Sequence, residues 1–559
     1  MFRTSRSAPA LILTVITGIA LAEPGTNIYE STDAAKPKSE LDRIVFGKLK
    51  KLGIQPVLCS DSVFVRRAYL DVLGTLPTTE EARQFIDDAN ENKRVVLIDQ
   101  LLKRDEFADY WSMKWGDVLR IKAEFPINLW PNAAQAYHRW VRQSIVENKP
   151  YDQFVREMLT SSGSNFRVGP VNFYRAIQNK TPNGIATSVA LTFMGARAES
   201  WPEDRLEHMS VFFSQIGYKP TSEWKEESVF WDPLKSASLA DSVAPGNAKV
   251  TTVVGPSAKE GEDEESETIA PPSEIKTLVV VLPDGAKVKI PPNKDPREVF
   301  ADWLIAKENP WFTKSIVNRV WAWLLGRGII HEPDDIRDDN PGSNSELLAY
   351  LEKELIEHNY DLKHLYRLVL TSQTYQLAST KQYDNPEAVA NFASYPLRRL
   401  EAEVLIDAIN KITGTTDLYT SAIPEPFTYI PRDMPAIAVA DGSITSPFLA
   451  LFGRSARATG MENERKNKLG SSQWLHMLNS SHIQTKLESS PKLRALLATR
   501  GRPEQKLEKI YLTVLSRRPT PEEAKAALSY GLAPNRMSRN DWIDVTWALI
   551  NSPEFLYRH

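Results

Sequence analysis

Cysteine is almost absent from this sequence, since Cys59 is the only one among 559 residues. Covalent c-type haem requires the pattern C-x-x-C-H, and cysteine-based zinc or iron–sulfur sites require several thiols, so these groups are excluded. A disulfide within the chain is excluded as well, and core packing must hold the fold together. Cys59 follows Val57 and Leu58, which favours a buried and unreactive thiol.

Catalytic signatures and a large excess of one charge are also missing. The sequence has no nucleophile elbow, no zinc-binding H-E-x-x-H, no P-loop and no G-x-G-x-x-G. The formal net charge is −3, so no basic field would attract nucleic acid. His358 and His364 are six residues apart, which does not place them on one face of a helix. We expect no cofactor, no metal and no nucleic-acid partner.

The first residues have the order of a secretory signal. Arg3 and Arg6 precede an apolar run over residues 8–21, and Ala20 and Ala22 form an A-x-A cleavage pattern. A membrane anchor would need about 20 apolar residues, and this run is shorter. We therefore expect a signal peptide over residues 1–22, an exported periplasmic or extracellular protein, and no transmembrane segment after cleavage.

Helical periodicity divides the rest of the chain. Apolar residues recur three and four positions apart over residues 40–218 and again over 295–559. The intervening segment, residues 219–294, differs: residues 233–275 are rich in Ser, Ala, Pro and Gly and carry an acidic run at 262–265, and an Asp-Gly hairpin signal follows at 284–285. The chain is too long for one core. We predict a mainly α protein, with two helical domains joined by a small β-containing, loop-rich insert.

One stretch of sequence occurs twice in the same register. Residues 69–82 and 511–524 share the order Tyr-Leu-x-Val-Leu, three further residues, and then Pro-Thr-x-Glu-Glu-Ala. The threonine and the second glutamate of each copy have the spacing of a capping box, which predicts a helix, a turn and a new helix. Ser343 and Glu346 have the same spacing ahead of a leucine-rich run. The repeat indicates a duplicated helical module and implies no reaction.

Several motifs resemble a pair of domains of unknown function. Residues 64–78 and 150–157 resemble the cytochrome-associated planctomycete domain PSCyt-two. Residues 309–312, 317–321 and 326–329 are similar to its companion domain, PSD-one. Further marks of the second domain are at residues 360–365, 452–454 and 475–479. The resemblance extends over nearly the whole chain that follows the signal.

The resemblance implies an exported protein without a settled activity. Members of this family often occur beside cytochrome c domains, and many carry C-x-x-C-H inside the first domain. This chain has no cysteine in the corresponding stretch, residues 193–202, or at residues 461–465, where relatives tend to have one. Electron transfer through a haem of this chain is therefore not supported.

Two sets of polar residues are candidate sites. The ligand-binding candidates are Arg319, Arg454, Glu464, Arg465, His476 and Asn479. His476 and Asn479 are three residues apart on a predicted helix and face the same side. This set could bind an acidic or sugar-like ligand, with arginine forks on carboxylate or sulfate, or it could be a buried ion-pair network that fixes helix packing. Arg319 beside Trp321 admits the same two interpretations.

An acidic loop precedes the turn at Pro341-Gly342. Its carboxylates are Asp334, Asp335, Asp338 and Asp339. Oxygen ligands of this kind suit Ca²⁺, but the spacing does not fit an EF-hand and Arg337 would oppose a cation. A solvated or salt-bridged loop is the other interpretation, and we name no metal.

The sequence supports three hypotheses for function. The first is a non-catalytic binding or scaffolding protein of the cell envelope, with acidic polysaccharide or other envelope proteins as partners. The second is a hydrolase that acts on extracellular polysaccharide through carboxylates that the sequence does not identify. The third is a haem-less partner of a periplasmic cytochrome assembly, an inference by analogy with cytochrome-bearing relatives.

Overall fold

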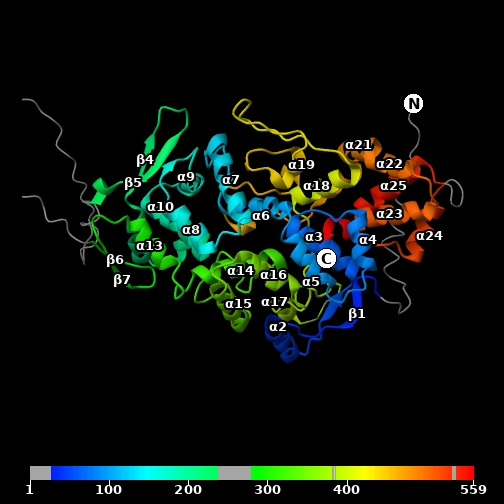
Figure 1. Cartoon of the computed structure of the whole chain (residues 1–559), viewed down its shortest axis with the longest axis horizontal. Helices are drawn as coiled ribbons and strands as arrows, with labels where there is room; N and C mark the ends of the chain where they lie inside the picture. Colours follow the sequence, from blue (N-terminus) through cyan, green and yellow to red (C-terminus); the bar gives the residue numbers. More distant parts are fainter. Residues whose placement is uncertain (1–26, 237–277, 381–382, 384, 532–536) are drawn as a thin grey trace, which may run out of the picture.

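The protein is described by a computed structural model (Figure 1). The described residues are 27–236, 278–380, 383, 385–531 and 537–559. The predicted signal peptide and the acidic run at 262–265 lie outside these residues. The fold is mainly α, as predicted, and the strands form small sheets. No helix in the described part of the chain is long and apolar enough to cross a membrane.

The first half contains short helices joined by tight turns. Its longer helices are α2 (Glu40–Lys51), α3 (Asp61–Leu73), α4 (Thr79–Asp87), α5 (Lys93–Leu101), α6 (Asp105–Val118), α7 (Pro131–Val146), α8 (Tyr151–Thr160), α10 (Pro182–Val189) and α11 (Glu203–Ser210), with a short α9 (Asn172–Arg175). Helix α3 ends at Gly74, whose φ of +63° is a conformation that glycine adopts without strain. The predicted helical periodicity of this half is confirmed.

The second half is also helical. Its helices are α13 (Pro296–Leu304), α14 (Phe312–Leu325), α15 (Ser345–Glu357), α16 (Leu362–Thr371), α17 (Pro386–Ala390), α18 (Ala402–Thr413), α19 (Pro447–Leu451), α20 (Ser471–Asn479), α21 (Ser481–Ser489), α22 (Pro491–Ala498), α23 (Pro503–Leu515), α24 (Pro521–Ser529), α25 (Arg539–Ile550) and α26 (Pro553–Leu556). The predicted capping box of α15 is wrong, because Asn344, one residue after Ser343, accepts the Leu347 N–H.

Strands are few and antiparallel. The sheets pair β1 (Glu30–Ala34) with β2 (Val57–Cys59), β5 (Glu227–Trp231) with β3 (Gly163–Ser164) and β4 (Ile216–Pro220), β6 (Leu278–Val281) with β7 (Lys287–Ile290), and β8 (Arg398–Arg399) with β9 (Tyr557–Arg558). The predicted hairpin is the β6–β7 pair, and Gly285 in its turn has a φ of +89°.

The two helical halves share one apolar core, so the expectation that the chain is too long for a single core is wrong. A single cluster of buried side chains runs from Leu41 to Leu556. Helix α2 packs on α15, α5 on α16, α8 on α13, and α4 on α23. Figure 1 shows the consequence, because α3 and α4 lie beside α23 although they come from opposite ends of the chain. The exact domain boundaries stay a prediction.

Both copies of the repeat form the predicted helix–turn–helix. Helices α3 and α4 make the first copy, and α23 and α24 make the second. Both predicted capping boxes are present, at Thr78 and at Thr520. The copies also contact each other, since the hydroxyls of Thr79 and Thr513 are 2.8 Å apart.

Candidate functional site

Two of the predicted ligand-binding arginines meet at one buried carboxylate. Glu403, on α18, is fully buried and accepts hydrogen bonds from Arg465 at 2.6 Å and from Arg454 at 3.2 Å. Arg465 also binds Asp117 of α6 at 2.6 Å, and Arg457 binds the second oxygen of Asp117 at 3.0 Å. Carboxylates of the protein therefore already occupy the guanidinium forks that one of the two interpretations assigned to a ligand.

Glu403 and the neighbouring Glu401 are ionised at neutral pH. Burial by itself would raise the pKa of Glu403, but the Arg465 and Arg454 guanidiniums outweigh burial and hold that pKa at about 2. The pKa of the neighbouring Glu401 lies well below its usual range, because Arg558 and Lys114 outweigh its burial in the same way. The groups are thus a network of buried ion pairs, which is one of the two interpretations that the sequence left open.

Arg319 joins the acidic loop instead of a ligand. Its guanidinium is buried, donates to Asp334 at 2.8 Å, and donates to the Thr192 carbonyl at 2.7 Å. The second oxygen of Asp334 accepts the Glu462 N–H at 2.7 Å. The hydrogen bond to the Thr192 carbonyl connects α14 to the segment that follows α10, so Arg319 fastens the second half of the chain to the first.

The remaining ligand-binding candidates lie apart from this network. Glu464 accepts the Ala458 N–H at 2.9 Å and the Ser455 hydroxyl at 3.3 Å, which closes its own loop. His476 stands on α20 against the ring of Phe448, at 5.6 Å between centroids. Asn479 is exposed at the end of α20. The structure therefore groups Arg454 with Arg465 and separates them from His476 and Asn479.

The acidic loop does not point its carboxylates at one centre. Asp334 is buried against Arg319, as described above, whereas Asp338 and Asp339 are exposed. Asp335 pairs with Arg337 at 3.1 Å, and Asp339 lies 3.6 Å from the same guanidinium. The salt-bridged interpretation fits this geometry better than a calcium site does.

The sequence did not reveal several buried charges that tie the halves together. Lys114 of α6 donates to Glu401 at 2.6 Å, and Arg558, near the chain end, donates to Asp71 at 2.6 Å and also pairs with Glu401. The Tyr375 hydroxyl donates to the other oxygen of Asp71 at 2.8 Å. The one signal in the sequence was Asp71, a carboxylate inside the apolar helix α3. Its partners, Tyr375 and Arg558, lie hundreds of residues away.

A second polar group surrounds His476. We call the residues Asp407, Asp417, Tyr419, His476 and His482 the aspartate–histidine cluster. His482 lies between the two ends of a row, with one ring nitrogen 3.0 Å from Asp417 and the other 3.5 Å from His476. The Tyr419 hydroxyl is buried and has no hydrogen-bond partner within the described part of the chain. Such a group is unusual in a protein interior.

The two aspartates of this cluster titrate in opposite directions. Burial raises the pKa of Asp407 to about 7, although the Ala436 and Ile437 N–H groups oppose the rise and the Glu403 charge adds to it. Burial also acts on Asp417, but its hydrogen bond with His482 and the charge of Lys486 lower the Asp417 pKa below its usual value. Neighbouring carboxyls with opposed pKa values are a pattern of acid–base sites.

A cleft of about 280 Å³ lies at the junction of the two repeat copies. We call it the repeat cleft; the turn before α4, the end of α18, and helices α21, α22, α23 and α25 surround it. Its apolar wall includes Leu76, Leu493 and Ile510, and two cations, Lys411 and Lys492, line it as well. The size approaches that of small-molecule sites.

The lysines of the repeat cleft bind main-chain carbonyls. The Lys411 ammonium donates to the Leu76 carbonyl, and the Lys492 ammonium donates to the Lys411 carbonyl at 2.8 Å. The hydroxyls of Ser490 and Thr546 donate to carbonyls in the same manner, at 2.7 and 2.8 Å. The carbonyl partners are neutral, but Glu80 also lines the cleft and the Glu81 and Glu106 carboxylates offset part of the Lys411 charge. Lys492 is therefore the stronger attractor for an anion.

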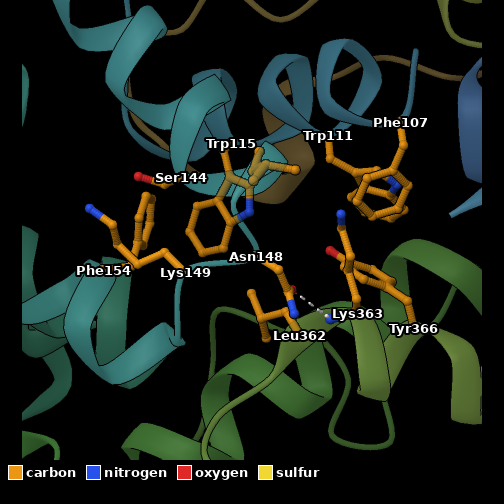
Figure 2. A pocket seen from close by; sticks show the side chains of 11 residues that line it. Phe107, Trp111, Trp115, Ser144, Asn148, Lys149, Phe154, Leu362, Lys363 and Tyr366 are labelled. Atoms are coloured by element: carbon orange, nitrogen blue, oxygen red, sulfur yellow. Dashed lines mark hydrogen bonds between the residues drawn. The ribbon is translucent and has the colours of Figure 1, made fainter. Parts of the chain in front are cut away.

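A smaller cavity between the halves is lined by aromatic rings. Figure 2 shows Phe107, Trp111 and Trp115 of α6 on one side, with Lys363 and Tyr366 of α16 on the other. Its volume is about 30 Å³, close to the share of one water molecule in the liquid. In this conformation it has room for a water-sized group and not for a sugar ring.

Two protein-family models match the chain. Residues 40–200 match the family described as Protein of unknown function (DUF1549), PSCyt2. Residues 296–530 match the family described as Protein of unknown function (DUF1553), PSD1. The comparisons with curated proteins and with solved structures gave no match. The order of the two domains is the order that the sequence motifs predicted.

Proposed function

Because this chain belongs to the family in which a DUF1549 domain is followed by a DUF1553 domain, and that family is of unknown function, we propose a function from the geometry alone. The protein is an exported binding protein of the cell envelope. It holds an acidic ligand in the repeat cleft, and acidic polysaccharide is the first ligand to test.

The composition of the repeat cleft is the observation that supports this proposal. Apolar side chains cover much of its wall, and Lys411 and Lys492 add positive charge to it. Saccharides that carry carboxylate or sulfate offer both an apolar ring face and an anion, so both parts of the wall would contact such a ligand. Lysine acts there as a point charge, which tolerates several anion geometries.

Rigidity supports a binding role too. The ion pairs Lys114–Glu401 and Arg558–Asp71 cross between the two halves and are buried. A ligand site at the junction of the repeat copies is then preorganised, because its walls are fixed before the ligand arrives.

Affinity capture with matched variants tests the proposal. The mature chain, Lys492→Glu and Lys307→Glu are each used to capture ligands from the envelope of the host, and bound protein and sugar are both analysed. Lys492 lines the repeat cleft, whereas Lys307 follows α13, far from it in Figure 1, and both are exposed. We expect Lys492→Glu to weaken capture roughly tenfold, the effect of about 1.4 kcal/mol.

Two results would count against the binding proposal. If the wild-type chain captures neither polysaccharide nor protein, the binding role loses its support. If Lys492→Glu and Lys307→Glu capture as much as the wild type does, a ligand exists but the repeat cleft does not hold it.

The aspartate–histidine cluster favours one alternative, a hydrolase acting on extracellular polysaccharide. Asp407 would be the protonated acid and Asp417 the ionised partner, since their pKa values differ in that sense. The release of reducing ends from acidic polysaccharides tests this alternative. If the protein is a hydrolase, Asp417→Asn should abolish turnover, and Asp338→Asn, a control at an exposed position, should retain it. Absence of turnover in the wild type would remove this alternative. The haem-less redox partner stays a prediction.

A further inference from the structure

The turn between α15 and α16 brings together three residues that can bind a metal. Glu354 and His358 are one helical turn apart at the end of α15, and His364 is in the first turn of α16. The chain reverses through Asn359 and Tyr360, whose φ values of +54° and +58° are left-handed. The reversal places His364 beside His358, which the six-residue spacing of a continuous helix would not do.

Contacts with other elements hold this turn in place. The Tyr360 hydroxyl donates to the Ile305 carbonyl at 3.1 Å, and the Tyr360 carbonyl accepts the Tyr151 N–H at 3.0 Å. Asp361 caps α16 by accepting the His364 N–H at 2.9 Å, and the Asn148 amide donates to the same carboxylate at 2.8 Å. The backbone that carries His358 and His364 is therefore held in place.

The three side chains converge. An oxygen of Glu354 is 3.0 Å from Nε2 of His364 and 3.6 Å from Nδ1 of His358. The two imidazole rings are stacked, with 3.5 Å between centroids and 12° between planes. One ligand atom from each residue lies within 4.8 Å of the other two. Both imidazoles would have to turn out of their stacked arrangement for one nitrogen of each ring to face the same ion as the Glu354 carboxylate.

The surroundings also suit a metal ligand set. Nδ1 of His358 is 2.8 Å from the Glu354 carbonyl, and an N–H donated there would make Nε2 of His358 the metal ligand, in place of the Nδ1 that lies near the carboxylate here. The Tyr350 hydroxyl hydrogen-bonds the Glu354 carboxylate, which would orient that ligand. The side chains of Glu354, His358 and His364 are 20%, 45% and 26% exposed, so an ion can reach them from solvent.

We propose that Glu354, His358 and His364 bind one divalent transition metal ion, with Zn²⁺ as the first candidate. Two imidazole nitrogens and one carboxylate oxygen suit zinc, whereas calcium and magnesium prefer oxygen ligands alone. Three protein ligands leave a fourth position for water or for an outside ligand. The ion would clamp α15 to α16. The proposal departs from our expectation of no metal, and it is independent of the repeat cleft.

Calorimetric titration with ZnCl₂ tests the site. The mature chain is used after its affinity tag has been cleaved off and its metal has been stripped with a chelator. We expect one Zn²⁺ per chain, and a weakening of about 100-fold or more in His364→Ala. His358→Ala is a second variant at a half-exposed position, in case His364→Ala does not fold. Co²⁺ in place of Zn²⁺ should give visible absorption bands that both variants lose.

His482→Ala is the matched control. It belongs to another group of two histidines and a carboxylate, but that group forms a row, with Asp417 and His476 at opposite ring nitrogens of His482. We expect His482→Ala to bind Zn²⁺ as the wild type does. The proposal is overturned if the stripped wild type binds no Zn²⁺. It is also overturned if the folded variants at His358 or His364 bind as tightly as the wild type, or if only His482→Ala loses binding.

Discussion

Glu403 is fully buried, and its charge is compensated by Arg454 and Arg465, which reach it from the loops after α19. Assembling such a group costs desolvation, so the network is not evidence of high stability by itself. Removing one member is different, because the opposite charges then remain buried and unpaired. Single carboxylates such as Glu403 and Asp117 should therefore tolerate substitution poorly.

Glu403→Gln tests this expectation. The amide keeps the shape of the side chain and loses its charge, so Arg454 and Arg465 lose their shared counterion. We expect the free energy of unfolding, measured by urea denaturation, to fall by about 3–5 kcal/mol. Asp338→Asn, which changes an exposed carboxylate of the acidic loop, should stay within about 0.5 kcal/mol of the wild type. Equal midpoints for the two variants would contradict the importance of this network.

Asp407 makes stability depend on pH. Its pKa is about 7 in the folded protein and about 3.9 in an unfolded chain. Between these two pH values the folded state keeps a proton on Asp407 that the unfolded chain loses. The contribution of Asp407 to the free energy of unfolding is therefore complete below pH 4 and is lost as the pH rises towards 7. A pKa unit is worth about 1.4 kcal/mol, so the loss is on the order of 2–4 kcal/mol.

Thermal unfolding between pH 5 and 8 measures this loss. The decline in midpoint with rising pH should be steeper for the wild type than for Asp407→Asn, which cannot ionise. Parallel curves for the two proteins would show that Asp407 titrates normally.

Contacts between individual side chains were the least predictable features of the structure. Arg465 could be singled out as a charge in a polar stretch, but its partner Asp117 lies more than 300 residues earlier. Ion pairs of this separation have no periodic signal, since the fold brings them together. The repeat cleft was missed for the same reason, because its walls come from several separate helices.

Helical elements were the most predictable level. Apolar spacing predicted the helices around α4, α5, α7 and α8, and residue spacing predicted the two capping boxes, because both signals are local. The turn after α15 was not predicted. It uses left-handed Asn359 and Tyr360, and tyrosine gives no turn signal.

The caps of the repeat copies provide a test at the scale of elements. Thr78→Ala and Thr520→Ala each remove the side chain that accepts an N–H from the third helical residue. We expect each substitution to lower the free energy of unfolding by about 1 kcal/mol in urea denaturation, within the usual range of about 0.5–2 kcal/mol for caps. Thr485→Ala, at an exposed site inside α21, is the control and should be neutral or slightly stabilising. Neutral results at both caps would mean that these turns do not depend on them.

The whole molecule should unfold as one unit, because one core and several buried charges run through both halves. Arg67 shows the connection: it donates to the carbonyls of Tyr375 at 2.6 Å and His559 at 2.8 Å, and its guanidinium lies 3.8 Å from the ring centre of Tyr395. Replacing it would leave buried carbonyls without donors, each of which costs about 1–3 kcal/mol.

Arg67→Met should therefore lower the midpoint of unfolding while the protein still unfolds in a single transition. Far-ultraviolet circular dichroism and tryptophan fluorescence should report the same midpoint before and after the change. Arg156→Met is the control, because the Arg156–Asp302 pair is exposed and contributes little. Two separated transitions in the wild type would show that the halves are independent.

The central claim is that this rigid molecule binds an acidic ligand in the repeat cleft. Hydrogen exchange measured by mass spectrometry, with and without a sulfated polysaccharide, tests it most directly. We predict that added protection is confined to peptides that contain residues 76–80, 411–413, 487–496, 510–514 and 546, where the cleft is lined. Protection elsewhere, or an unchanged exchange pattern at saturating polysaccharide, would contradict the claim.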